Sequence, residues 1–312
     1  MIQAQELTKR YGSITALDKI SFEVAQGEIV GFLGPNGAGK TTAMRILTGY
    51  SPATGGIARI AGYDVAKDPI EVKRRVGYLP ESVPLYGEMV VRHFLRYVSE
   101  IKGVPRHGLQ AETDRVMSLC GLQQMGGRII KNLSKGYRQR VGLAQSLIGN
   151  PPVLILDEPT VGLDPSQIIE IRQMIRELAH NHTVLLSTHI LPEVSMLCQR
   201  VLIIHNGRLV AQDTMENLMG PEDGVVRLEV DARGPREQVE SLLSELDGVQ
   251  RVKLDGAGPS FVVEAAADSD IQPRIAEAVV RAGYRLCGLR ERARTLEDIF
   301  VEAISVDEGV QV

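Results

Sequence analysis

The most informative segment of the 312-residue chain reads Gly34-Pro35-Asn36-Gly37-Ala38-Gly39-Lys40-Thr41-Thr42. It fits the pattern G-x-x-x-x-G-K-[ST], whose glycines let successive backbone N–H groups close around phosphate oxygens. An apolar run, Ile29–Leu33, precedes it, and Thr41–Leu47 follows with helical character, so a helix N-terminus would face the anion. We therefore expect these nine residues to bind a nucleotide. Lys40 should reach the β- and γ-phosphates, and the Thr41 hydroxyl should bind Mg²⁺.

A second segment supplies the carboxylates that such a loop needs. The apolar run Val153–Leu156 ends in Asp157 and Glu158. An apolar strand that ends in a carboxylate completes the Mg²⁺ site of P-loop NTPases. Asp157 is therefore predicted to bind the ion through water, and Glu158 to polarise the attacking water as general base.

The rest of the first 220 residues alternates short apolar runs with longer helical segments. Val184–Ser187 and Val201–Ile204 are further strand-sized runs, typical of a buried parallel sheet whose faces helices cover. Strand signals fade between residues 87 and 150. That part is predicted to be a helical insert with helices over Val91–Lys102, Leu109–Leu119 and Tyr137–Ile148.

The pattern restarts after a cluster of helix breakers at residues 219–224, which we interpret as a linker. The order β-α-β-β-α-β that follows is that of a ferredoxin-like module. Its predicted elements are strands over Val225–Val230, Val249–Leu254, Phe261–Glu264 and Arg285–Leu289, helices over Glu237–Leu246 and Ile271–Ala282, and a turn over 255–259. Thr295 is predicted to cap a terminal helix.

Composition excludes several classes of protein. Hydrophobic residues make up 44% and charged residues 24%, which is typical of a globular chain with a core and not of a disordered one. A net charge of -4 argues against bulk electrostatic binding of nucleic acid. Three scattered cysteines, Cys120, Cys198 and Cys287, favour a reducing compartment without a disulfide framework. The N-terminus is not a secretory signal, and no apolar run reaches the ~18 residues of a membrane helix, so no direct membrane insertion is expected.

Several motifs resemble those of ATP-binding cassette (ABC) proteins, in the order that this family shows. Leu133–Arg140 resembles the family's signature motif, and Asp157–Asp164 resembles its Walker B strand with the following D-loop. Ser187-Thr188-His189 is similar to the switch-histidine segment, Gly77–Glu81 to the Q-loop region and Tyr11-Gly12 to the adenine-stacking A-loop. The resemblance covers residues 1 to about 220.

The resemblance implies a mechanism for these positions. Two ATPase domains would pack head to tail around two ATPs. Each ATP would touch the Gly34–Thr42 loop of one subunit and the signature motif of the other. The signature contacts fall on Ser134, Lys135 and Gly136, where the N-terminus of a helix can face the γ-phosphate. The resemblance further implies that Tyr11 stacks on adenine, that Asp164 lies at the nucleotide, and that His189 contacts the γ-phosphate and the attacking water.

Two positions depart from the common family pattern. Glu81 stands where the Q-loop usually carries glutamine, and a carboxylate there can still hold Mg²⁺ or its water but cannot donate an amide N–H. We interpret Glu81 as a variant metal-site residue, with a plain surface carboxylate as the alternative. Tyr137 stands where the signature usually has its glutamine, and this leaves Ser134 and Gly136 in place.

The outlying segments leave alternatives open. The insert, about residues 82–150, would be the family's α-helical subdomain, and Ser82–Tyr86 would either line the groove for a membrane subunit or pack in the core. Thr295–Val301 resembles the tail of ABC-2 type ATPases, and Leu133–Leu143 with Gly162–Gln167 look closest to the gliding-motility type. The C-terminal module shows no recognisable catalytic cluster. A packing or dimer-stabilising appendage is favoured for it over a regulatory ligand site.

The sequence thus predicts an α/β P-loop NTPase of the ABC ATPase class with a helical subdomain (domain 1–220), and an accessory ferredoxin-like domain (225–312). Its expected function is ATP binding and hydrolysis, with ATP and Mg²⁺, as a homodimer that drives a separate transmembrane permease, for export. It would lie in the cytoplasm on the inner face of the membrane and bind no nucleic acid. The alternatives are a non-transport ABC ATPase acting on ribosomes or DNA, and a nucleotide-binding regulator that does not hydrolyse ATP.

Overall fold

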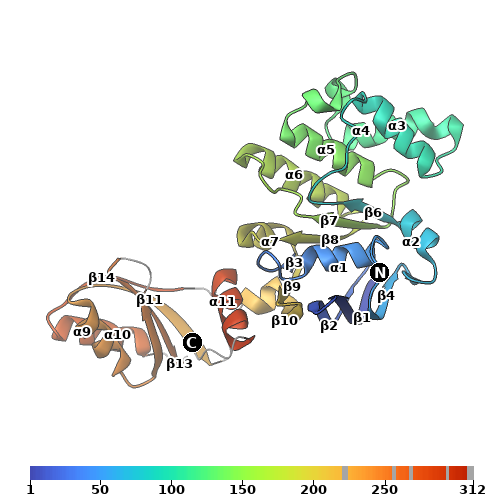
Figure 1. Ribbon diagram of the computed structural model, residues 1–312. Coiled ribbons are helices and arrows are strands. Elements are labelled where there is room, and N and C mark those ends of the chain that lie inside the picture. Colours follow the sequence, from blue (N-terminus) through green and yellow to red (C-terminus); the bar gives the residue numbers. More distant parts are fainter. Residues whose placement is uncertain (220–223, 255–257, 267–269, 293–294, 308–312) are drawn as a thin grey trace. The chain divides into compact units, whose positions relative to one another are not determined.

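The computed structural model describes residues 1–219, 224–254, 258–266, 270–292 and 295–307 (Figure 1). The chain divides into two compact units. Met1–Thr214 makes up nearly all of the first, and Met215–Val301 forms the second. The predicted linker at residues 219–224 and the turn at 255–259 lie partly outside the described residues.

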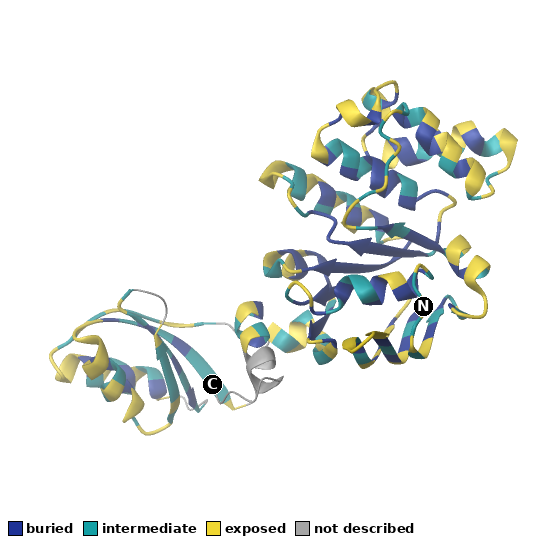
Figure 2. Ribbon diagram, viewed as in Figure 1, coloured by how far each residue is buried: buried dark blue, intermediate teal, exposed yellow. Residues whose placement is uncertain are grey.

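A six-stranded sheet in the order β10-β9-β3-β8-β7-β6 forms the centre of the first unit. Its strands are β3 Ile29–Leu33, β6 Val76–Leu79, β7 Val153–Asp157, β8 Thr183–Thr188, β9 Arg200–His205 and β10 Arg208–Thr214. All neighbours pair in parallel except β9 and β10. Strands β3, β7 and β8 are buried at every residue, because helices cover the sheet, and this explains their continuous apolar sequences (Figure 2).

A second, antiparallel sheet in the order β2-β1-β4-β5 corrects the expectation of one parallel sheet with helical connections. Its strands are β1 Ile2–Tyr11, β2 Ile14–Val24, β4 Gly55–Ile60 and β5 Tyr63–Asp64. Only one face of β2 is buried, so its apolar residues alternate with polar ones and form no continuous run. Apolar side chains of both sheets and of α1, Lys40–Leu47, share one core cluster that includes Leu17, Met44 and Leu202.

Helices make up the region that lacked strand signals. The predicted helices are present as α3 Val91–Ile101, α4 Leu109–Leu119 and α5 Lys135–Ser146, each within two residues of the expected bounds. The other helices of this unit are α2 Pro69–Arg75, α6 Pro165–Leu178, α7 Leu191–Leu197 and the short turns Arg106–Gly108, Gln123–Met125 and Ile130–Asn132.

The second unit opens with α8 Met215–Met219 and then follows the predicted order of elements. These are β11 Val225–Arg233, α9 Arg236–Ser244, β12 Val249–Leu254, β13 Ser260–Ala266, α10 Ile271–Arg281 and β14 Arg285–Glu291. The four strands form an antiparallel sheet in the order β12-β13-β11-β14, and α9 and α10 share a separate core with it around Phe261. The last helix, α11 Leu296–Asp307, begins where Asp298 N donates to Thr295 Oγ1 at 3.2 Å, so the predicted cap is present.

Candidate nucleotide-hydrolysis site

The loop between β3 and α1 borders a cavity of about 330 Å³. Its lining comes from four segments that are distant in sequence: Ala16, six loop residues (Asn36, Gly37, Gly39, Lys40, Thr41 and Thr42), Glu81 and Glu158. The structure therefore brings Glu81 to the same cavity as the loop. Sequence reasoning missed Ala16, because a single alanine on an alternating strand carries no chemical signal.

Glycine is required within this loop by conformation and by space. Gly39 has φ +112°, and a Cβ there would lie 2.7 Å from the carbonyl oxygen of Ala16. A Cβ at Gly34 would overlap the carbonyl oxygen of Ile204. The loop backbone is therefore held tightly between β2 and β9.

Lys40 is the cation of this cavity and is 6% exposed. Its ammonium donates to the carbonyl oxygens of Gly34 at 2.8 Å and Pro35 at 3.2 Å. The same nitrogen lies 3.4 Å from Oε1 of Glu158. A buried ammonium needs such partners, and these place its charge between the phosphate-binding loop and the acidic strand end.

Asp157 at the end of β7 is completely buried. Its Oδ1 accepts hydrogen bonds from Ser187 Oγ at 2.5 Å and Thr41 Oγ1 at 3.3 Å. Its Oδ2 has no hydrogen-bond partner among the described residues. Asp157 is not itself among the lining residues of the cavity, but Thr41, which donates to it, lines the cavity together with Glu81. An orphaned buried carboxylate oxygen beside this hydroxyl fits the oxygen ligands that Mg²⁺ prefers. Thr41, Asp157 and Glu81 are thus suited to hold the ion.

Glu158 and His189 form a direct pair. Nδ1 of the imidazole lies 3.0 Å and 2.9 Å from the two carboxylate oxygens, and Glu158 is 5% exposed. Glu158 adopts φ +49°, a left-handed conformation that costs roughly 1–2 kcal/mol for a residue other than glycine. Its N–H is held by Ser187, through the carbonyl oxygen at 3.1 Å and Oγ at 3.0 Å. Ser187 therefore holds the carboxylate of Asp157 and the backbone of Glu158, a role that its sequence position alone did not reveal.

The signature residues and Asp164 do not line this cavity. Ser134 caps α5, and its Oγ accepts from Tyr137 N at 3.4 Å. Asp164 caps α6 and accepts from Gln167 N at 3.0 Å. Gly136 packs against Gln167, and the ammonium of Lys135 lies over Gly162, where a Cβ would overlap it. The signature helix and the start of α6 thus form a second cluster of the predicted nucleotide-binding residues, separate from the first.

Tyr11 is not among the lining residues either. It is 48% exposed at the end of β1, and the Lys9 ammonium lies 4.9 Å from its ring centroid. An exposed aromatic face of this kind can still stack on a planar base. Its predicted contact with adenine remains a prediction.

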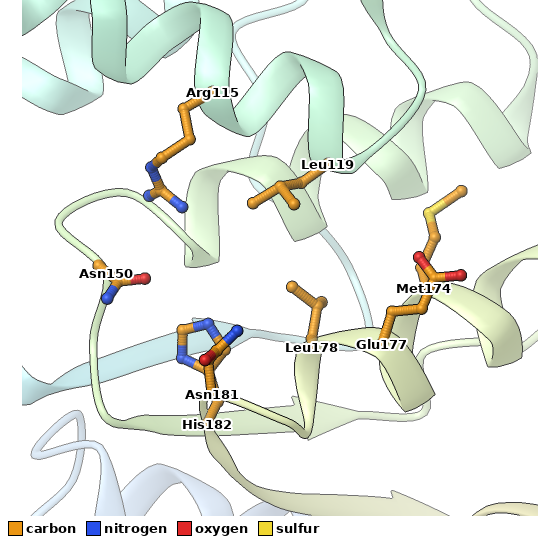
Figure 3. A pocket seen from close by; sticks show the side chains of 8 residues that line it. All are labelled: Arg115, Leu119, Asn150, Met174, Glu177, Leu178, Asn181 and His182. Carbon is orange, nitrogen blue, oxygen red and sulfur yellow. The ribbon is translucent and has the colours of Figure 1, made fainter.

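Another cavity, of about 230 Å³, contains none of the predicted site residues (Figure 3). It lies between Arg115 and Leu119 of α4, the turn at Asn150, three residues of α6 and the Asn181–His182 segment. The Arg115 guanidinium is bound by the Glu112 carboxylate and by the carbonyl oxygen of Leu147, each at 2.8 Å. The charged group of Arg115 is thus already paired with residues that do not line the cavity.

His182 at this cavity should make stability depend on pH. Burial lowers its pKa below the ordinary value of 6.5, and the Arg115 charge lowers it further, although a hydrogen bond with the carbonyl oxygen of Pro151 opposes both. Below about pH 6.5 the unfolded chain binds a proton that the folded chain resists, so stability should fall with decreasing pH. In His182→Asn the drop in melting temperature between about pH 7.5 and 5.5 should be smaller. His107→Asn, which removes an exposed imidazole, is the control, and an equal drop in both variants would contradict the assignment.

The fold and the loop together define a nucleotide-binding protein of the P-loop class. The family model described as ABC transporter matches residues 17–161. The bacitracin transport ATP-binding protein BcrA of Bacillus licheniformis is 39% identical over 220 residues, which are 70% of this chain and 71% of that protein. This chain belongs to the family of ABC transporter ATP-binding proteins, as the sequence motifs predicted. Members of this family bind and hydrolyse ATP.

Two further likenesses extend the comparison. The uncharacterized ABC transporter ATP-binding protein YhcH of Bacillus subtilis is 32% identical over 305 residues, 97% of this chain and 95% of that protein. The second unit is therefore included in that match. A dimeric structure of the ATP-binding cassette MJ0796 with bound ADP and Pi shares the fold of the first unit, with a TM-score of 0.63, 23% identity and coverage of 69% of this chain and 99% of that one. Among the residues that the structure describes, no helix is both long and apolar enough to cross a membrane.

Proposed function

We propose that this protein is the ATP-hydrolysing subunit of an ABC-2 type transporter, and that it drives export through a separate transmembrane permease. The observation that carries the proposal is that Lys40 and Glu158 line one cavity with the phosphate-binding loop, 3.4 Å from each other, and that the Glu158 carboxylate is paired with His189. A binding module without hydrolysis would not need a carboxylate held by a histidine beside the lysine of the loop.

The residues divide the chemistry among them. The loop amides and Lys40 bind the β- and γ-phosphates, and the N-terminus of α1 favours their negative charge. Glu158 accepts the proton of the attacking water. His189 orients that carboxylate and contacts the γ-phosphate. When bound, Mg²⁺ neutralises charge on the phosphates, and Thr41, Asp157 and Glu81 are the residues that would hold it. Tyr11 stacks on the adenine.

The active form is a homodimer around two ATPs. Ser134, Lys135, Gly136 and Asp164 do not line the cavity of their own subunit, although the first three sit at the start of α5, where N–H groups favour an anion. In the homodimer these four residues contact the ATP that is bound to the loop of the second copy. The dimeric cassette with ADP and Pi supports this arrangement by its shared fold.

The permease contact and the second unit complete the proposal. The helical region around α3–α5 receives the permease, and this holds the protein at the cytoplasmic face of the membrane. We assign the ABC-2 type from Thr295–Val301 and the gliding-motility likeness from Leu133–Leu143. The elements β11–β14, α9 and α10, within the predicted domain 225–312, form a ferredoxin-like accessory domain that stabilises the assembly. The strand order β12-β13-β11-β14 with both helices on one core supports this assignment.

Purification of the tagged full chain from detergent-solubilised membranes tests the transport part of the proposal. We expect one polytopic membrane protein to copurify in a fixed ratio, and the complex to hydrolyse ATP. The Lys40→Ala chain should retain that protein, because the loop lies at the nucleotide and not at the permease surface. Recovery of ribosomes or DNA as the bound partner, with no membrane protein, would contradict a transporter subunit.

A further inference from the structure

Glu193 is a buried carboxylate that none of the motifs shared with the ABC family includes. It contacts the segments that carry Glu158 and His189. Glu193 belongs to α7, and it is 1% exposed. Its Oε1 accepts from Thr160 Oγ1 at 2.5 Å, and its Oε2 accepts from Thr188 Oγ1 at 3.0 Å. Nη2 of Arg172 lies 3.5 Å from Oε1. A carboxylate is costly to bury, so partners on every side are needed to keep it there.

The two threonines connect this carboxylate to both members of the Glu158–His189 pair. Thr160 lies two residues after Glu158, within the turn where Val161 N donates to the Glu158 carbonyl oxygen at 3.2 Å. Thr188 directly precedes His189, and its hydroxyl also accepts from Ile190 N at 3.0 Å. Both threonine side chains are buried. One carboxylate thus joins the segment after the general base to the strand end that carries the histidine.

We infer that Glu193 is a positioning residue for ATP hydrolysis. It keeps the imidazole of His189 at hydrogen-bonding distance from the Glu158 carboxylate. This inference rests on the proposed function. Glu158 and His189 come from separate segments, the end of β7 and the end of β8, and Glu158 has a strained backbone. Hydrogen bonds to a charged acceptor are stronger than neutral ones, so the Thr160–Glu193–Thr188 bridge can hold both segments against small displacements. Hydrolysis is sensitive to such displacements, whereas nucleotide binding by the loop is not.

The test compares Glu193→Ala, Glu193→Gln and Thr160→Val in the full chain, with kcat and KM for ATP expressed per folded nucleotide-binding site. We expect kcat to fall roughly 10- to 100-fold in Glu193→Ala and KM to change less than about threefold. In Thr160→Val kcat should fall less than in Glu193→Ala. Thr160→Ser keeps the hydroxyl, so its kcat should be close to that of the unaltered chain. The exposed carboxylate Glu177, changed to alanine, is the matched control.

A second experiment measures the effect of Glu193→Gln on kcat in a His189→Ala chain. It distinguishes a positioning role of Glu193 from a merely structural one. Because Glu193 acts through the histidine, the cost of Glu193→Gln should shrink to less than about threefold in a His189→Ala chain. An undiminished cost in that background, or an unchanged kcat per folded site in all three variants, would overturn the inference. If Glu193→Ala does not fold, Glu193→Gln and the threonine pair decide the question alone. Absence of ATPase activity in the unaltered chain would instead reject the proposed function, and with it the inference.

Discussion

Glu158→Gln should reduce the rate of ATP hydrolysis by at least about 100-fold while ATP still binds and holds two chains together. Glutamine keeps the size of the side chain and can still hydrogen-bond His189, but it cannot accept the proton of the attacking water. Lys40 would lose the charge 3.4 Å away and keep its two carbonyl partners. Loss of the base should therefore stop the reaction after binding.

Size-exclusion chromatography with and without ATP, beside a steady-state ATPase assay, measures both parts of this prediction. The unaltered chain should dimerise only transiently, because hydrolysis releases the partner, whereas the variant should remain dimeric. Glu177→Gln, which changes an exposed carboxylate on α6, is the matched control. Hydrolysis at the normal rate in Glu158→Gln would remove Glu158 from the role of general base.

Lys40→Ala should weaken ATP binding by a factor of about 10 to 1,000, with hydrolysis falling at least as far. The substitution removes the buried cation of the loop. It also leaves the Glu158 carboxylate without the ammonium 3.4 Å away, so that negative charge faces the incoming γ-phosphate without compensation. Both effects oppose the binding of ATP more than the binding of a nucleotide that lacks the γ-phosphate.

Titration with a fluorescent ATP analogue and with ADP measures this difference. The loss of affinity should be larger for ATP than for ADP. Lys67→Ala, which removes an ammonium that is 80% exposed, should leave both affinities unchanged. Equal affinity for ATP in the Lys40→Ala and unaltered chains would contradict the proposed contact with the phosphates.

The elements that sequence reasoning recovered are those with a strong local signal. Continuous apolar runs identified β3, β7, β8 and β9, because a parallel strand covered on both faces is apolar at nearly every residue. The helices α3 and α4 followed from their apolar periodicity. The antiparallel sheet of β1, β2, β4 and β5 was missed. A strand such as β2, with one buried face, spreads its apolar residues among polar ones and resembles a loop to a search for continuous runs.

The same distinction applies to the candidate site: residues in local motifs were predicted, and residues that act through contacts between distant segments were not. Lys40, Asp157 and Glu158 belong to motifs whose residue types and spacing predict phosphate binding, metal binding and proton transfer. The structure brings them together. The residues that hold them in place were not predictable. Ser187, Thr160 and Glu193 act through hydrogen bonds between segments 29 and 33 residues apart. Such a bond depends on the register of β7 against β8 and on the position of α7. Neither can be predicted from the sequence of one segment alone.

The tight packing of the phosphate-binding loop has a thermodynamic consequence. Because the Cβ positions of Gly34 and Gly39 are filled by the carbonyl oxygens of Ile204 and Ala16, the backbone of the loop is already ordered by β9 and β2. A preorganised loop loses little conformational entropy when a ligand arrives. Most of the free energy gained from contacts with the triphosphate then remains for a second process. In an ATPase that works as a dimer, that process is the closing of two subunits around the nucleotide.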